Sequence, residues 1–253
     1  MIVNYSKKDI KAWAEFSGDY NPIHFDINKA LSYGLVCCPV QGMLGAMDVK
    51  TNIHTHSFSA KMAFKDYIHS EKDYEIITDG KKKIFFGEEC LINCKISDFS
   101  FENNLTNLHN VEINDQDIVA LKTFSDYRMA SCNVKDQIWS LLDALLFRKI
   151  FKTKYSKPFL TFISDVLNIK SLNSINDIMA LKFTVQISHE INVSEKALQL
   201  STFDDLKYFS LKIADPINIF DDNEKLILEF NAFITYNDNI VLSEKPIILL
   251  KKK

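Results

Sequence analysis

Apolar residues occur along this chain in two patterns, one typical of helices and one typical of strands. In segment 8–16 the apolar residues are spaced for a single buried face, which predicts a helix with Ser6 as its N-cap and Gly18 at its end. A second, shorter helix is expected to open at Asp26, a residue type favoured at N-caps, and to close at Gly34. The first quarter of the chain is therefore expected to be mainly helical.

Two further helices are predicted to be more deeply buried. The first begins near Gln41-Gly42 and runs toward Ile53, and the second spans 135–151 and is apolar almost all round. Strand patterns accompany both, with a hairpin turn at Asp79-Gly80. Strands or extended segments are expected at 61–70, 72–78, 82–96, 118–129, 158–169, 178–187, 208–219, 225–236 and 240–250. Each half thus has a long helix and antiparallel strands, an α+β pattern in which a sheet wraps a helix.

The division of the chain follows from this repeat. The asparagine-rich segment 103–117 has no sustained periodicity and is the best linker candidate, which gives expected halves of 1–116 and 117–253. All six glycines lie in the first 87 residues. Glycine allows backbone conformations and close approaches to a ligand that other residues do not, so we expect the functional site in the first half.

Composition narrows the class of protein. The 253 residues carry a net charge of -3, with 47% hydrophobic and 25% charged residues, which is ordinary for a globular protein and shows no basic excess for nucleic acid. We find neither an apolar run of membrane-spanning length nor a secretory signal pattern. The odd number of cysteines, five, favours reduced thiols over a disulfide framework. A cytoplasmic protein that binds neither nucleic acid nor membrane is expected.

The densest group of chemically active residues lies in segment 16–26. A turn built by Gly18 and Asn21-Pro22 is expected to bring Asp19 and His24 together outside regular elements. A carboxylate and an imidazole that reach one water can perform general acid–base catalysis. The Asn21 side chain can hold the turn by local hydrogen bonds.

A complementary group is expected at the start of the buried helix. The Gly42 N–H would lie at the positive end of the helix dipole, where it could bind a developing oxyanion on a carbonyl. Gln41 and Met43 flank it and are expected to contact the same substrate. The pattern therefore suggests acid–base chemistry beside a polarised carbonyl.

These residues together resemble the hydratase motif of (R)-specific enoyl-CoA hydratases and MaoC-like dehydratases. The matching positions are Ser17-Gly18-Asp19-x-Asn21-Pro22-Ile23-His24-x-Asp26, then Gly34 and Pro39-Val40-x-Gly42-Met43-Leu44. The resemblance implies a hot-dog fold and reversible addition of water to the 2,3 double bond of an acyl thioester of coenzyme A or acyl carrier protein. It implies that Asp19 and His24 are the catalytic pair, that Asn21 supports the loop and that the Gly42 amide binds the thioester oxygen. It implies no metal and no redox cofactor.

The sequence departs from this family pattern in two respects. Gln41 stands where the family usually has a histidine before the Gly-Met pair, and the second half has no Gly-Asp-x-Asn-Pro-x-His motif. We therefore expect a double hot-dog whose second half has lost catalysis. Double relatives use that half to widen the acyl tunnel, which favours a longer or bulkier acyl chain by fold analogy. Sheet pairing would then be internal, and the chain either a monomer or a homodimer of double units.

Two other functions stay open at this stage. A thioesterase on the same fold would use a helix carboxylate such as Asp48. A non-catalytic acyl-thioester-binding subunit would explain Gln41 and the degenerate second half. The pair His54 and His56 has no partner ligand at suitable spacing, so no metal site is predicted.

Overall fold

The computed structural model describes residues 1–80, 83–87, 90–99, 101, 108–169, 172, 175, 177–178 and 182–252. In the first half the elements are β1 Ile2–Val3, α1 Lys7–Ser17, η1 Pro22–His24, α2 Ile27–Ser32, α3 Gly42–Lys50, β2 Phe58–Phe64, β3 Tyr74–Asp79, β4 Lys83–Phe86, β5 Ile92–Asp98 and β6 Leu108–Val111. They continue as α4 Asp115–Cys132, α5 Ile138–Lys152, α6 Lys157–Leu167, β7 Thr184–Val193, α8 Glu195–Leu198, η2 Phe203–Tyr208, β8 Phe209–Ala214, β9 Ile217–Asp221, β10 Lys225–Glu229, β11 Ala232–Tyr236 and β12 Asn239–Lys251.

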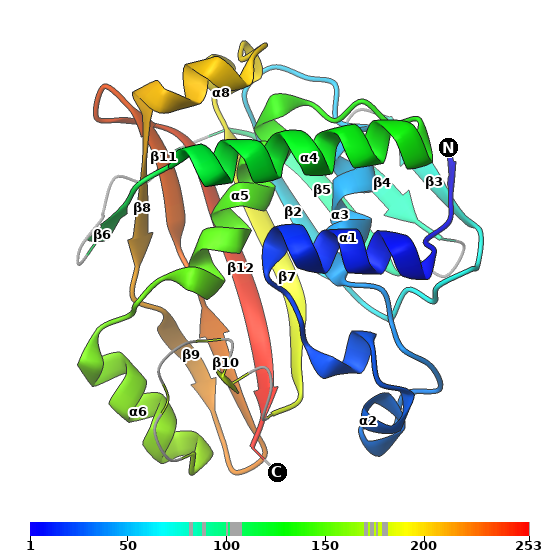
Figure 1. Cartoon of the computed structure of the whole chain (residues 1–253), viewed down its shortest axis with the longest axis vertical. Helices are drawn as coiled ribbons and strands as arrows, with labels where there is room; N and C mark the ends of the chain where they lie inside the picture. The colour runs from blue at the N-terminus through cyan, green and yellow to red at the C-terminus, as the bar shows by residue number, and fades with distance from the viewer. Residues whose placement is uncertain are drawn as a thin grey trace.

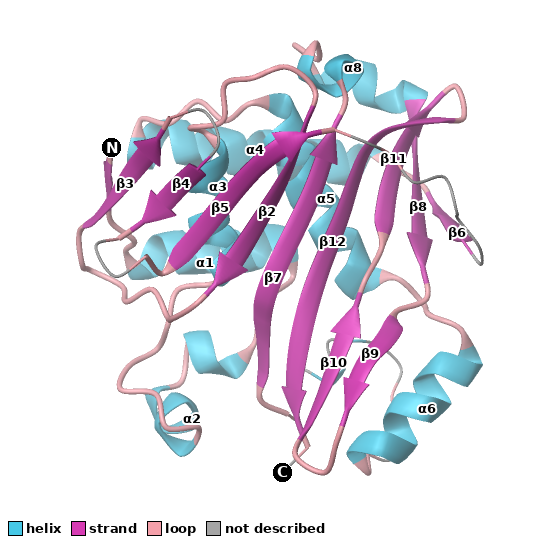
Figure 2. Ribbon diagram, turned by 180° about the vertical axis from the view of Figure 1, so that it is seen from behind, coloured by secondary structure: helices cyan, strands magenta, loops and turns pink. Residues whose placement is uncertain are grey.

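One antiparallel sheet joins the strands of both halves. Its order is β1-β3-β4-β5-β2-β7-β12-β11-β8-β6, and β10 pairs with both β12 and β9. Figures 1 and 2 show the sheet on one side of the molecule, with α1, α4 and α5 gathered on the other. The central helices α3 and α5 contact each other as well as strands of the sheet. This is a double hot-dog fold, as the sequence predicts.

The two halves meet at the pairing of β2 with β7. This pairing runs from Phe58↔Val193 to Ala63↔Ser188, while β7 continues to Thr184 against β12 alone. One buried cluster contains core residues of both central helices, among them Met47 and Leu142. Burial of apolar surface therefore holds the halves together as well as each half by itself.

The helix boundaries near the motif follow the predicted capping residues. Ser6 and Asp9 form a capping box at the start of α1, and Gly18 ends the helix with a left-handed φ of 83°. The Asp26 carboxylate accepts hydrogen bonds from the first turn of α2, and Gly34 also has a positive φ of 83°. These local signals fix where the chain leaves α1 and re-enters a helix, and so they fix the loop between them.

The prediction of an extended segment at 118–129 is wrong. These residues lie in α4, where Leu121, Phe124 and Arg128 form its buried face at helical spacing. Asn114 and Asp117 form a capping box that begins the helix. The residues between them are largely polar and exposed, so the buried face of α4 is narrow. The helical period of this face is therefore hard to recognise in the sequence.

The strand predicted at 158–169 is also wrong, because this segment forms α6. Ser156 caps the helix and Pro158 stands in its first turn, where proline is well tolerated. Phe159, Ile163 and Leu167 are buried. Thr161 and Asp165 between them are exposed, whereas the buried face of a strand would include every second residue. The β-forming residue types of this segment are thus overridden by its caps and its period.

The remaining strands were predicted with shifted or merged boundaries. The segments 82–96, 208–219 and 225–236 each divide into two strands, and the predicted strand 178–187 is found as β7 at 184–193. Part of the predicted strand 178–187 and residues 103–107 of the predicted linker 103–117 lie outside the described residues. The described rest of that linker contains β6 and the first residues of α4, so the linker prediction is wrong for these residues. No helix among the described residues has the length and apolar character needed to cross a membrane.

Candidate active site

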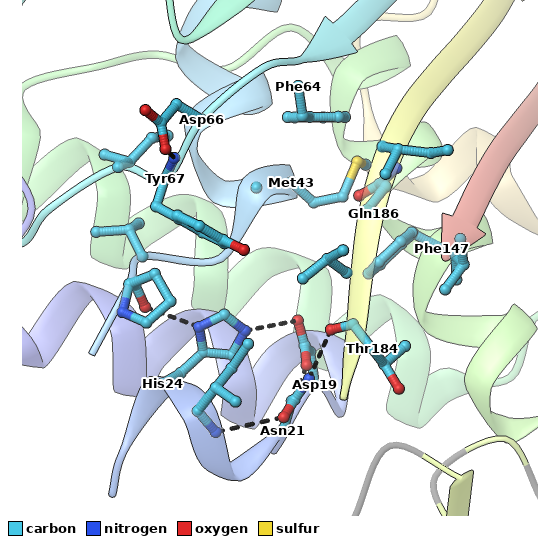
Figure 3. Close-up of a pocket in the computed structure, with 18 of the residues that line it drawn as sticks. Asp19, Asn21, His24, Met43, Phe64, Asp66, Tyr67, Phe147, Thr184 and Gln186 are labelled. Atoms are coloured by element: carbon cyan, nitrogen blue, oxygen red, sulfur yellow. Dashed lines mark hydrogen bonds and ion pairs between the residues drawn. The ribbon is translucent and has the colours of Figure 1, made fainter. Parts of the chain in front are cut away.

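Asp19 and His24 face each other across the loop that follows α1. Asp19 is buried, and its Oδ2 lies 3.9 Å from His24 Nε2 (Figure 3). This distance is too long for a direct hydrogen bond, yet an oxygen atom about 2.8 Å from each of the two atoms fits between them. The pair is thus spaced to hold one water molecule or hydroxyl group.

The orientation of the His24 ring is fixed by the backbone. His24 Nδ1 lies 2.7 Å from the Pro39 carbonyl oxygen. Because a carbonyl can only accept, the Nδ1 atom carries the proton and donates it. The Nε2 atom is therefore left to exchange a proton on the side facing Asp19.

Burial sets the acidity of Asp19. Desolvation raises the pKa of its carboxyl, while the nearby His24 and the hydrogen bond from the Asn21 N–H oppose that rise. The Asn21 N–H lies 3.3 Å from Asp19 Oδ1. A carboxyl with a raised pKa is better matched to proton transfer near neutral pH than an exposed aspartate.

Asn21 connects this loop to the second half of the chain. Its Oδ1 accepts from the Ile23 N–H, which caps η1, and its Nδ2 donates to the Thr184 carbonyl at 3.0 Å. Asn21 is buried. The loop that carries Asp19 and His24 is therefore held from both sides, by its own turn and by the first residue of β7.

A cavity of about 220 Å³ opens beside the pair. It lies beyond the last pair between β2 and β7, so that the first residues of β7 form one wall. The central helix of the second half adds the Phe147 and Phe151 side chains. The lining includes Asp19, Asn21, His24, Pro39, Gly42, Met43, Phe64, Asp66, Tyr67, Thr184, Gln186 and Ile248. Its mostly apolar surface suits an acyl chain, with a few polar groups at one end.

The start of α3 also reaches the cavity. Gly42 is the first residue of this helix, and its N–H forms no hydrogen bond with another described residue. A Cβ atom at this position would lie 3.2 Å from Phe64 Cδ1. Glycine thus allows Phe64 to pack closely against the start of the helix. The unpaired Gly42 N–H lies at the positive end of the helix dipole, in the cavity wall.

The two neighbours of Gly42 differ in their placement. Met43 is buried and lines the cavity. The Gln41 side chain is turned toward α1, where its Nε2 donates to the Ile10 carbonyl at 3.1 Å, and it is absent from the cavity lining. The structure thus brings Asp19, Asn21, His24, Gly42 and Met43 to one cavity and leaves Gln41 behind the wall.

Asp48 does not reach this cavity. It is buried on α3, with one carboxylate oxygen bonded to Arg128 at 2.8 Å and the other to the Tyr5 hydroxyl at 2.5 Å. Arg128 also binds Asp136. Both oxygens are therefore engaged in a structural ion-pair network, and neither is free to attack a thioester.

A second buried polar cluster lies between the two central helices and the sheet. Lys50 of α3 forms an ion pair with Asp143 of α5, and His189 Nε2 lies 2.8 Å from an Asp143 oxygen. Burial opposes ionisation of Asp143, but His189 and Lys50 outweigh it and lower the pKa of this carboxyl. Burial and the Asp143 charge raise the pKa of Glu244 well above its usual range. The Lys50 charge thus compensates the Asp143 charge, and burial favours the neutral form of Glu244.

The same cluster contains a set of metal-ligating atoms. Asp143, His189 and Glu244 each place one such atom within 4.8 Å of the others. Lys50 already supplies a positive charge beside Asp143, and a cation would be repelled by it at this range. The donor set therefore fits an ion-paired cluster better than a metal site.

Several cavity residues were not anticipated from the sequence. Tyr67 follows β2 and points into the cavity, while Thr184 and Gln186 approach from β7 (Figure 3). These residues lie far from the motif in sequence, and no local pattern marks them. Only the pairing of β7 with its neighbours brings them to the site.

Comparison with known proteins finds solved structures, described as dehydratases or as hot-dog proteins, that are similar to this chain. No family model matches the sequence, and no curated protein matches it. A Chloroflexus aurantiacus protein described as a MaoC domain dehydratase is similar in structure, at 9% identity and a TM-score of 0.49, covering 100% of this chain and 93% of that one. A conserved hypothetical protein from Mycobacterium tuberculosis with a double hot-dog fold is similar at 9% identity and a TM-score of 0.43, covering 99% and 94%.

Structures described as thioesterases are also similar. An acyl-CoA thioesterase II from Mycobacterium marinum has 8% identity and a TM-score of 0.39, covering 84% of this chain and 90% of that one. At such identities these likenesses do not distinguish dehydratase from thioesterase chemistry, so function must be inferred from the residues of the cavity.

Proposed function

We propose that this protein is a hydro-lyase that interconverts (R)-3-hydroxyacyl and trans-2-enoyl thioesters of coenzyme A or acyl carrier protein. The observation that carries the proposal is the 3.9 Å gap between Asp19 Oδ2 and His24 Nε2 beside an apolar cavity. This gap accommodates the oxygen that is added or removed. The apolar cavity accommodates the acyl chain.

In the hydration direction the pair acts as acid and base on one water molecule. The thioester carbonyl accepts a hydrogen bond from the Gly42 N–H, which draws electrons from the double bond and makes Cβ electrophilic. The Asp19–His24 pair removes a proton from the water as its oxygen bonds to Cβ, and the pair returns a proton to Cα. Dehydration is the reverse sequence. Because adding or removing water is not a net oxidation or reduction, neither direction requires an electron acceptor.

The thioesterase alternative lacks its candidate residue in the cavity. Asp48 is held by Arg128 and Tyr5 and is absent from the cavity lining. A non-catalytic binding subunit would not require a buried carboxylate aimed at an imidazole whose tautomer is fixed by Pro39. Ionisable groups arranged in this way at a cavity favour catalysis over binding alone.

The decisive experiment follows the absorbance of trans-2-enoyl thioesters of increasing chain length, on both coenzyme A and acyl carrier protein, while free thiol is measured in parallel. Wild-type protein is expected to abolish the enoyl absorbance without releasing thiol, and Asp19→Asn and His24→Ala are each expected to lose about 10²-fold or more of the rate. Thiol release would instead indicate a thioesterase. Binding without turnover on either carrier would indicate a non-catalytic subunit.

A further inference from the structure

A strand irregularity in β7 places one polar side chain in the otherwise apolar part of the cavity. In the β7–β12 pairing Ile247 is opposite Ser188, but Ile248 is opposite Gln186, so Ile187 is an extra residue. Bulges of this kind re-aim side chains and are frequent beside active sites. Gln186 is the residue that this bulge redirects.

Its consequence can be seen from the spacing of Gln186 and His189. Residues three apart in a regular strand point to opposite faces of the sheet. Here Gln186 Nε2 lies 3.4 Å from His189 Nδ1, so the two side chains share a face. Figure 3 shows Gln186 extending from β7 beside Met43 and Phe64.

The orientation of the Gln186 amide follows from the tautomer of His189. His189 Nε2 contacts both Asp143 oxygens, at 2.8 and 3.1 Å, and so must carry a proton. Burial lowers the pKa of His189, which favours the neutral ring. Its Nδ1 is then an acceptor, and the neighbouring amide group of Gln186 must be the NH₂.

This arrangement leaves the other end of the amide for a ligand. Both contacts of the Gln186 amide, to His189 and to the Ser188 carbonyl, use Nε2. No donor from a described residue reaches Oε1, although Gln186 lines the cavity. The Lys50–Asp143–His189 cluster behind it holds the amide in this sense, because reversal would place an oxygen against the acceptor Nδ1.

We propose that Gln186 is a specificity-determining residue whose amide oxygen accepts a hydrogen bond from a donor on the acyl group. The ligand class is an acyl thioester that carries a hydroxyl or an amide N–H beyond C3. This inference rests on the proposed function for the thioester and the C3 chemistry. Gln186 is partly buried in the cavity wall. An all-hydrocarbon chain would cover its amide oxygen without pairing it, so the cavity selects a ligand that brings a donor.

The test uses equilibrium binding of saturated ligands, which have no double bond to hydrate. Hexanoyl-pantetheine is compared by calorimetry with its isomers hydroxylated at C4, C5 or C6, since the pantetheine arm is common to both carriers. In wild-type protein one hydroxylated isomer is expected to bind about 3- to 10-fold more tightly than the parent ligand. Gln186→Leu and Gln186→Met are expected to abolish that preference, with melting curves reporting their folding.

Gln116→Leu, at an exposed position on α4, is the matched control and is expected to keep the preference. Equal binding of all ligands by the wild type, or no binding, would overturn the proposal, as would a preference that survives in both Gln186 variants. If Gln186→Leu weakens the parent and hydroxylated ligands equally, the partner of Gln186 lies in the pantetheine arm and the acyl assignment is wrong. Loss of enoyl hydration with the binding preference intact would refute only the proposed reaction.

Discussion

The Asn21 side chain donates a hydrogen bond of 3.0 Å to the backbone carbonyl of Thr184, 163 residues further along the chain. A residue of the loop after α1 is thereby bound to the first residue of a strand from the other half. The loop also carries Asp19 and His24, so the position of the proposed acid–base pair depends on β7.

Asn21→Ala should therefore impair both stability and catalysis. The change leaves the buried Thr184 carbonyl without this donor, at a cost of about 1–3 kcal/mol, and frees the loop to move. We expect the rate to fall about tenfold or more because small displacements of reacting groups are costly. Asn21→Asp, which keeps the Oδ1 acceptor but removes the donor, should behave similarly. Chemical denaturation and initial rates measure the two effects, and wild-type values for both would contradict the role of this bond.

Asp19→Asn should lose activity while gaining stability at neutral pH. A carboxyl whose pKa is raised by folding contributes full stability below its unfolded pKa and loses that contribution as the pH rises through its folded pKa. Ionised Asp19 therefore costs stability at pH 7, and an amide removes the cost. Melting temperatures across pH are the measurement. The variant should exceed wild type near neutrality and converge with it in acid; the opposite trend would show that the Asp19 charge is stabilised in the fold.

The pH dependence of the rate offers a separate test of Asp19. If its carboxylate is the base in hydration, kcat/KM should fall as the pH drops through a pKa above the value of about 3.9 for an exposed aspartate. The profile should be recorded within the pH range where the protein remains folded. An acid limb at or below the ordinary aspartate value would argue against a buried catalytic carboxyl.

Two substitutions at Gly42 can distinguish the role of its N–H from the role of its missing side chain. Gln41 has φ −62° and ψ 132°, which is compatible with a following proline, and proline is tolerated at the first position of a helix. Gly42→Pro should thus remove the N–H, keep α3 and reduce kcat about 10²- to 10³-fold. Gly42→Ala keeps the N–H and crowds Phe64, so its smaller loss is the steric control. Equal rates for the two variants would exclude an oxyanion role for this amide.

Asp48→Asn should distinguish the structural role of Asp48 from a catalytic one. Its charged bonds to Arg128 and Tyr5 are buried, so weakening them should cost about 1.5–3 kcal/mol of unfolding free energy. The rate per folded molecule should stay at the wild-type level because Asp48 does not reach the cavity. A rate loss of 10²-fold in a folded variant would restore the thioesterase interpretation.

The ion pair between Lys50 and Asp143 should be essential to the assembly of the two halves. Lys50→Met leaves a buried carboxylate uncompensated, which costs about 3–5 kcal/mol. This cost is a large fraction of the free energy of unfolding of a typical domain, about 5–15 kcal/mol. The double variant Lys50→Met/Asp143→Asn should be less destabilised than Lys50→Met alone. Urea unfolding curves measure both. A single variant within about 1 kcal/mol of wild type would show that Asp143 finds another counterion.

Local sequence signals were sufficient for the parts of the site that are local. The capping residues Ser6 and Asp26, the left-handed Gly18 and the Asn21-Pro22 turn define the loop and bring Asp19 to His24. Capping residues are also present at α4 and α6, although the residue types of both segments are typical of strands. In both segments the caps and the helical spacing of buried residues decide the structure. In both segments the caps, Asn114 and Ser156, mark where the helix begins more reliably than the residue types that follow them.

Contacts between distant segments could not be predicted in this way. Gln41 flanks Gly42 in sequence, yet its side chain bonds Ile10 because α1 lies against that side of the helix. Gln186 enters the cavity only because a bulge displaces β7 by one residue. Neither the partner of Gln41 nor the register of β7 has a local signature, since both depend on packing across the fold.

The place where β2 stops pairing with β7 also divides β7 into two stretches that should differ in their tolerance of substitution. Between Ser188 and Val193 the strand is held by neighbours on both sides, whereas residues 184–187 have β12 on one side and the cavity on the other. In a library of random β7 variants, changes in the paired stretch should lower the yield of folded protein. Changes at 184–187 should instead yield folded protein with altered ligand preference, so these four positions are where a new acyl specificity could arise by mutation without rebuilding the motif.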